Sequence, residues 1–179
     1  MMKFLLHRSI RSFERKAKYD ATYWHEVVNA APGAGARLFG LPMMSQYSGP
    51  STEIWAGASF ASALEGDCGP CAQLVLDQAL EVGVSADALR ACLRRDFEAA
   101  GDVGLGFRFA EAAIAGDLAL DDLRAEIRAK HGDRAVIAAG FAACSSRAYP
   151  VLKRALGHAH ACRKLDFGDT EETVLRPAA

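Results

Sequence analysis

Apolar side chains recur every three to four residues along most of the chain, which is the spacing of helices rather than of strands. A first amphipathic and basic helix is predicted over 3–17, and a second over 20–31. A denser series of helices begins at Ser51 and continues to a last helix over 150–162. The pattern predicts no sheet, so we expect an all-α fold of about seven to eight helices.

The interruptions between these helices divide the chain into three parts. Proline and glycine are concentrated in 32–50, which we therefore predict to be a connecting segment. Residues 1–49 are predicted to form an N-terminal helical arm that includes this segment, and 50–163 the helical core. The end, 164–179, holds acidic residues and a proline with little periodicity, and is predicted to be a loose tail.

The composition agrees with a helical chain of one domain. Of 179 residues, 35 are alanine and 18 are leucine, whereas Val, Ile and Thr together number 18; helices favour the first group. The net charge of −1 provides no strong basic field for binding nucleic acid. No apolar run of membrane-spanning length and no signal peptide is evident. We therefore expect no membrane partner and a cytoplasmic location.

Two of the five cysteines are close together, in the sequence Cys68-Gly69-Pro70-Cys71. An odd count without a secretory signal does not indicate a disulfide framework. A helix is predicted to begin at this pair, and the free amide groups and dipole of a helix start favour a thiolate. One sulfur can then attack a substrate, and the other can resolve the product into a disulfide. We interpret the pair as a dithiol/disulfide redox pair, with a structural pair or half of a metal site as alternatives.

The surroundings of the pair resemble a known family. Two stretches carry the resemblance, ALEGDCGPC at 63–71 and ALEVGVSADAL at 79–89. With them, the segment from Glu53 to Arg95 is similar to the core of the alkylhydroperoxidase D-like and carboxymuconolactone decarboxylase superfamily. The resemblance implies a helical bundle of that family and thiol peroxidase chemistry. It also implies that no organic cofactor and no metal is required, that a partner dithiol supplies electrons, and that the chain forms a homo-oligomer.

One position departs from the family pattern. The resemblance implies a proton-relaying histidine four residues after the second cysteine, where this chain has Val75. Another group must then accept the thiol proton. Glu65 lies three residues before Cys68, and Glu53 lies fifteen before it, about three farther than the glutamate of the family. The alternative to a catalytic role is that Glu53 is an acid favoured by the dipole of its helix, and that Glu65 is a solvated loop residue. The predicted catalytic residues are Cys68, Cys71, Glu65 and Glu53.

These features lead us to expect a thiol-dependent oxidoreductase that reduces peroxides or exchanges disulfides through the Cys-x-x-Cys pair. One alternative is a non-catalytic helical protein on the same fold that binds a partner or senses redox state. A second alternative is a zinc-binding helical module. In that case His158 and Cys162, which would share one helix face, would complete a site with the cysteine pair.

Overall fold

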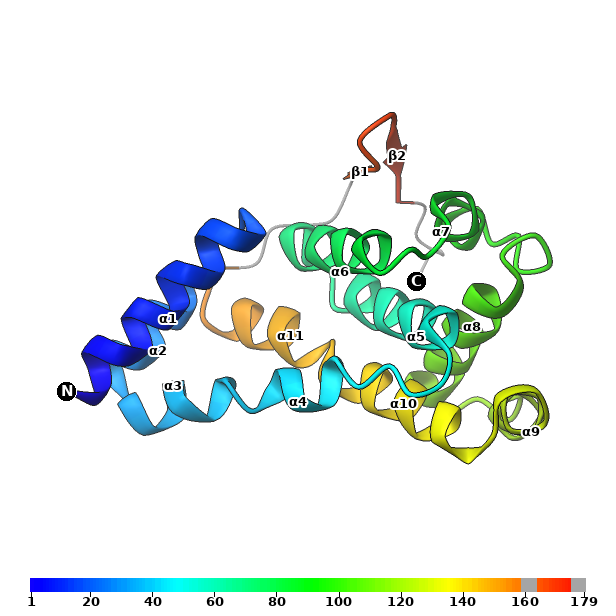
Figure 1. The fold of residues 1–179 in the computed structure, drawn as a ribbon, viewed down its shortest axis with the longest axis horizontal. Coiled ribbons are helices and arrows are strands. Elements are labelled where there is room, and N and C mark those ends of the chain that lie inside the picture. The colour runs from blue at the N-terminus through cyan, green and yellow to red at the C-terminus, as the bar shows by residue number, and fades with distance from the viewer. Residues whose placement is uncertain (159–163, 175–179) are drawn as a thin grey trace.

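The structure is a computed structural model that describes residues 1–158 and 164–174, and within them the chain is all-α apart from a small hairpin (Figure 1). The helices are α1 (Met2–Ala17), α2 (Thr22–Ala30), α3 (Pro32–Leu38), α4 (Leu41–Ser45), α5 (Thr52–Glu65), α6 (Gly69–Glu81), α7 (Ala86–Leu93), α8 (Gly101–Ala115), α9 (Leu120–His131), α10 (Asp133–Ser145) and α11 (Ala148–Ala155). The antiparallel strands β1 (Lys164–Asp166) and β2 (Glu171–Thr173) form the hairpin.

Helix α5 is the centre of the main core. Its start is defined by Ser51, whose hydroxyl accepts a hydrogen bond from the Ile54 amide at 3.2 Å, as N-cap serines do. Residues 54–63 are all buried, and α5 packs against α6, α8 and α10. The alanine, glycine and serine residues of this stretch leave room for neighbouring backbones to approach closely.

Helices α5 and α8 cross at two glycines that have no space for a side chain. A Cβ added at Gly57 would lie 1.9 Å from the Val103 carbonyl oxygen, and one added at Gly106 would lie 2.1 Å from the Ile54 carbonyl oxygen. Both atoms that would be struck belong to the backbone, so no side-chain rotation relieves the overlap. The spacing of these two helices therefore depends on glycine.

Substitution Gly57→Ala is expected to lower the free energy of unfolding by at least about 2 kcal/mol, because α5 and α8 must separate to admit the methyl group. Gly140→Ala in α10 is the matched control, since an added Cβ there meets nothing within 4 Å. It is expected to stabilise by up to about 1 kcal/mol, the helix preference of alanine over glycine. Urea unfolding followed by circular dichroism measures both; equal midpoints would contradict the close crossing.

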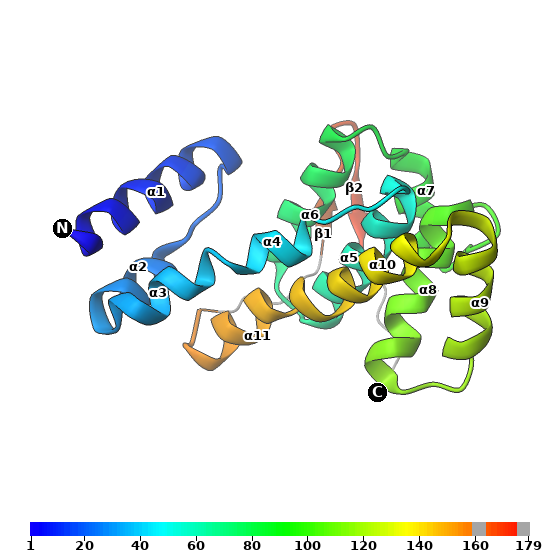
Figure 2. The same cartoon turned by 60° about the horizontal axis from the view of Figure 1, so that its bottom comes forward.

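Helices α1, α2 and α3 form an arm at the end of the molecule opposite α8 and α9, and α11 lies between this arm and the core (Figures 1 and 2). The arm does not share the main core. Its buried side chains form a second hydrophobic cluster, and this cluster includes both cysteines of the Cys-x-x-Cys sequence. Its members are Ile10, Tyr19, Ala21, Tyr23, Trp24, Val28, Cys68 and Cys71.

The segment 32–50 is helical where a connecting segment was predicted. It contains α3 and α4, both short. Pro32 is the first residue of α3, and Pro42 lies in the first turn of α4. Proline is favoured at these positions because its fixed φ suits a helix start and its missing amide is not needed there. The prolines that suggested an interruption therefore begin helices.

The end of the described chain also differs from the prediction. The last helix ends at Ala155 rather than near 162. Residues 164–173 form a hairpin that packs on the core, with Leu165 and Phe167 buried, so the predictions of no sheet and of a loose tail are wrong for these residues. The Gln73 side chain holds the Asp166 backbone, donating to its carbonyl oxygen and accepting from its amide. Strands of three residues are too short to show the alternation of apolar and polar residues by which a strand is recognised in a sequence.

One helical stretch in the described part of the chain, 133–155, has the length and mean hydropathy that a membrane span requires. It is not an uninterrupted apolar run, since Asp133, Arg134, Arg147, Lys153 and Arg154 lie within it. The stretch comprises α10 and α11, and several α10 alanines are buried in the protein core. Because a buried core helix passes the same test, this finding alone is weak evidence for a membrane.

Candidate functional site

The cysteine pair lies at the start of α6, as the sequence predicts. Cys68 directly precedes the helix with extended backbone, and Cys71 follows Pro70 in the first turn. Cys68 is 0% and Cys71 4% exposed, and both are present as thiols. Their backbone belongs to the core and their side chains pack with the arm, so the pair sits where these two parts meet.

The position at the helix start does not give Cys71 a low pKa. A hydrogen bond with Cys68 and burial together hold the pKa of the Cys71 thiol well above its usual value. A hydrogen bond with Tyr19 and the charge of Lys153 act in the opposite direction, but more weakly. Since the thiolate is the reactive form, the raised pKa makes the Cys71 thiol a weak nucleophile unless a nearby group accepts its proton or stabilises the negative charge of the thiolate.

Tyr19 and Lys153 extend from Cys71 as a buried hydrogen-bond chain. The Tyr19 hydroxyl lies 3.4 Å from the Cys71 Sγ, and the Lys153 Nζ donates to the same hydroxyl at 3.2 Å. Burial is the main cause that holds the pKa of Tyr19 far above its usual value, so this side chain remains a phenol. The chain therefore joins a cationic group to the Cys71 sulfur through a neutral hydroxyl.

Lys153 is unusual because it is a lysine only 4% exposed. Its Nζ lies 4.8 Å from the ring centre of Tyr19 and 5.2 Å from that of Tyr23, within the range of cation–π attraction. The Lys153 ammonium takes part in no ion pair within residues 1–158 and 164–174. Its positive charge therefore lies against aromatic rings and acts on Cys71 and on the Asp20 carboxylate.

Cys71 also lines a cavity of about 300 Å³. Six of the fifteen described residues that line it are aromatic, and none of the fifteen is charged. The aromatic ones are Phe13, Tyr19, Tyr23, Trp24, Phe39 and Tyr149. Cys68 is not part of the wall. A small molecule in the cavity therefore meets Cys71 and not Cys68.

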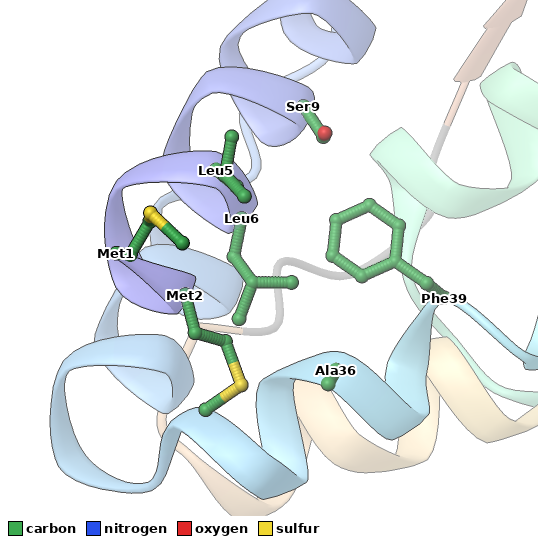
Figure 3. A pocket seen from close by; sticks show the side chains of 7 residues that line it. All are labelled: Met1, Met2, Leu5, Leu6, Ser9, Ala36 and Phe39. Atoms are coloured by element: carbon green, nitrogen blue, oxygen red, sulfur yellow. The ribbon is translucent and has the colours of Figure 1, made fainter.

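A second cavity, of about 440 Å³, lies beside the N-terminal end of α1 (Figure 3). The side chains that line it are Met1, Met2, Leu5, Leu6, Ser9, Ala36 and Phe39. None of these side chains can ionise or act as a strong nucleophile at neutral pH. The cavity at Cys71 is therefore the better candidate for chemistry.

The two predicted glutamates lie away from the cavity at Cys71. Glu53 is exposed in the first turn of α5, where its carboxylate accepts hydrogen bonds from the Ser51 and Thr52 hydroxyls. Glu65 is exposed at the end of α5 and forms an ion pair of 2.7 Å with Arg147 Nη2. Neither carboxylate lines the wall in which Cys71 lies. The structure thus brings the two cysteines together, but not the two glutamates with them.

Tyr19 and Lys153 were not predicted from the sequence, and Val75 lines the cavity where the family pattern has its histidine. Tyr19 is the polar group that contacts Cys71 instead. Tyr23 and Trp24 follow Tyr19 in the sequence, and these aromatic residues are only a weak sign that Tyr19 belongs to a site. The sequence gives no sign that Lys153 belongs to a site, because basic residues are common in the last turn of a helix.

The zinc interpretation gains nothing from the described residues. His158 Nε2 pairs with Glu26 Oε2 at 2.7 Å, and Cys162 lies outside the part of the chain that the structure describes. Within that part, no three His, Cys, Asp or Glu side chains are grouped so that they could hold a metal ion.

Comparison of the chain with protein-family models, with curated proteins and with solved structures finds no match. The resemblance to the alkylhydroperoxidase D-like family therefore stays a prediction from the sequence. The functional argument rests on the residues of this chain.

Proposed function

We propose that this chain is a thiol-dependent oxidoreductase in which Cys71 and Cys68 cycle between a dithiol and a disulfide. One observation carries the proposal: Cys71 lines an aromatic cavity, while Cys68 is hydrogen-bonded to it and fully buried. This arrangement suits an attacking sulfur that meets the substrate and a resolving sulfur beside it.

With an organic hydroperoxide as substrate, the Cys71 sulfur attacks the terminal peroxide oxygen. An S–O bond forms, the O–O bond breaks, and the thiol proton reaches the leaving oxygen, giving an alcohol and a sulfenic acid. The Cys68 thiol then attacks the sulfenic sulfur, an S–S bond forms, and water leaves. A partner dithiol reduces the disulfide by exchange and is itself oxidised. This partner, a homo-oligomer and a cytoplasmic location belong to the proposal on the sequence argument alone.

The chain from Lys153 through Tyr19 compensates the raised pKa of Cys71. As negative charge develops on the sulfur, the Tyr19 hydroxyl donates to it, and the ammonium donates to the same hydroxyl from behind. Tyr19 touches the reacting sulfur, whereas Lys153 acts through Tyr19 as a positioning residue. In this proposal the two residues take the place of the histidine missing at Val75.

One observation favours the non-catalytic, redox-sensing alternative. The raised pKa of Cys71 makes the resting thiol a poor nucleophile, which suits a slow sensor better than a rapid enzyme. The two proposals share the same disulfide and differ in turnover.

Titration of the reduced protein with cumene hydroperoxide tests the proposed function. We expect two thiols to be lost for each peroxide consumed, and dithiothreitol to restore both and sustain repeated turnover. One oxidation with no turnover in excess dithiothreitol would favour the sensor. No thiol loss would overturn both.

A further inference from the structure

Ser59 leaves a polar atom without a partner beside the cavity at Cys71. It belongs to α5, is 2% exposed and lines the cavity. Its Oγ has no hydrogen-bond partner among the residues that the structure describes. Ser62, one turn later on the same helix, shows the ordinary arrangement, since its buried Oγ donates to the Ala143 carbonyl oxygen at 2.7 Å. A buried hydroxyl left unpaired is costly, and a bound ligand would remove that cost.

The rest of the wall defines the class of ligand. The aromatic side chains offer flat apolar faces, which favour a ring stacked or packed among them. No charged side chain is among the described wall residues, and the nearby Lys153 ammonium donates to Tyr19 without being part of the wall. An ionised ligand is therefore disfavoured, because it would lose its water without direct contact with a counter-ion. The volume of about 300 Å³ lies at the lower end of small-molecule sites, so it suits one or two rings.

We propose that this cavity binds an uncharged, mainly apolar molecule of one or two rings whose single hydroxyl-type head group hydrogen-bonds to Ser59. The proposal goes beyond the redox proposal, since binding requires no reaction at Cys71. It rests on the proposed function only in that, if Cys71 reacts, a molecule held in this way is presented to its sulfur.

Isothermal titration calorimetry with three naphthalenes of equal ring size tests this site at neutral pH. The probes are 2-naphthol, 2-methylnaphthalene and 2-naphthoate, which carry a hydroxyl, a methyl and a carboxylate. We expect 2-naphthol to bind about tenfold more tightly than 2-methylnaphthalene, which is the effect of one hydrogen bond, and 2-naphthoate to bind more weakly than either.

Ser59→Ala is expected to weaken 2-naphthol binding about tenfold and to leave 2-methylnaphthalene binding unchanged, so that the preference disappears. Ser62→Ala is the matched control and is expected to keep the preference, because Ser62 is not among the wall residues. Equal binding of 2-naphthol and 2-methylnaphthalene to the unmodified protein, no binding of either, or an unchanged preference in Ser59→Ala would overturn the site. Binding with the expected preference in a protein that consumes no peroxide would uphold the site and reject the proposed function.

Discussion

Substitution Cys71→Ser is expected to reduce peroxide consumption to the rate of dithiothreitol alone, whereas Cys68→Ser is expected to allow a single reaction. The difference follows from position: Cys71 lines the cavity, and Cys68 is 0% exposed behind it. Without Cys71 none of the described residues that line the cavity carries sulfur. Without Cys68 the sulfenic acid still forms but has no partner with which to condense.

The measurement is consumption of cumene hydroperoxide by each variant, with dimedone added to trap sulfenic acid. We expect the trapped adduct on Cys71 in Cys68→Ser and no adduct in Cys71→Ser. Cys144→Ser is the control, because Cys144 is exposed on α10 and lies outside the cavity wall; it is expected to match the unmodified protein. An adduct on Cys68 in Cys71→Ser, with consumption retained, would reverse the assigned roles.

Substitution Lys153→Met is expected to slow the oxidation of Cys71 about a hundredfold at neutral pH, a loss typical of removing a group that stabilises developing negative charge. Methionine keeps an unbranched chain in the buried position, so the fold is expected to persist. The charge of Lys153 lowers the pKa of Cys71, and its removal therefore raises that pKa further. In both proteins this pKa lies above its usual value, so the oxidation rate rises with pH through neutrality, and the variant is slower at each pH.

The test distinguishes a positioning role from a structural one by a double-mutant cycle with Tyr19→Phe, which removes only the hydroxyl that joins Lys153 to Cys71. Because both residues act through one hydrogen-bond chain, the double variant is expected to lose about as much rate as either single variant. Stopped-flow oxidation rates and thermal unfolding are recorded for all four proteins. Losses that simply multiply, or a Lys153→Met protein that oxidises normally, would show that the chain does not assist Cys71.

The helices and the position of the cysteine pair were predictable because their causes are local. Apolar spacing determines which segments form helices, and a proline two residues after Cys68 suits a helix that begins there. The sequence also predicted that the arm is helical. It did not predict that the arm forms one side of the candidate site. That role depends on the packing of Tyr19 and its neighbours around the cysteines, which no local pattern reports.

The polar residues of the site were poorly predicted because sequence distance is a weak guide to contact. Tyr19 lies 52 residues from Cys71 and 134 from Lys153, yet the three side chains form one chain of contacts. Glu65 is only three residues from Cys68, but the intervening turn, in which Asp67 has a left-handed φ of 51°, separates the two side chains. Glu65 then pairs with Arg147 instead.

Disulfide mapping of the reduced protein after one equivalent of cumene hydroperoxide tests most directly whether the two sulfurs at the start of α6 form a redox pair. The account predicts an intact mass lower by two hydrogens and one peptide in which Cys68 is joined to Cys71. An unchanged mass, or oxidation confined to Cys92 or Cys144, would contradict it.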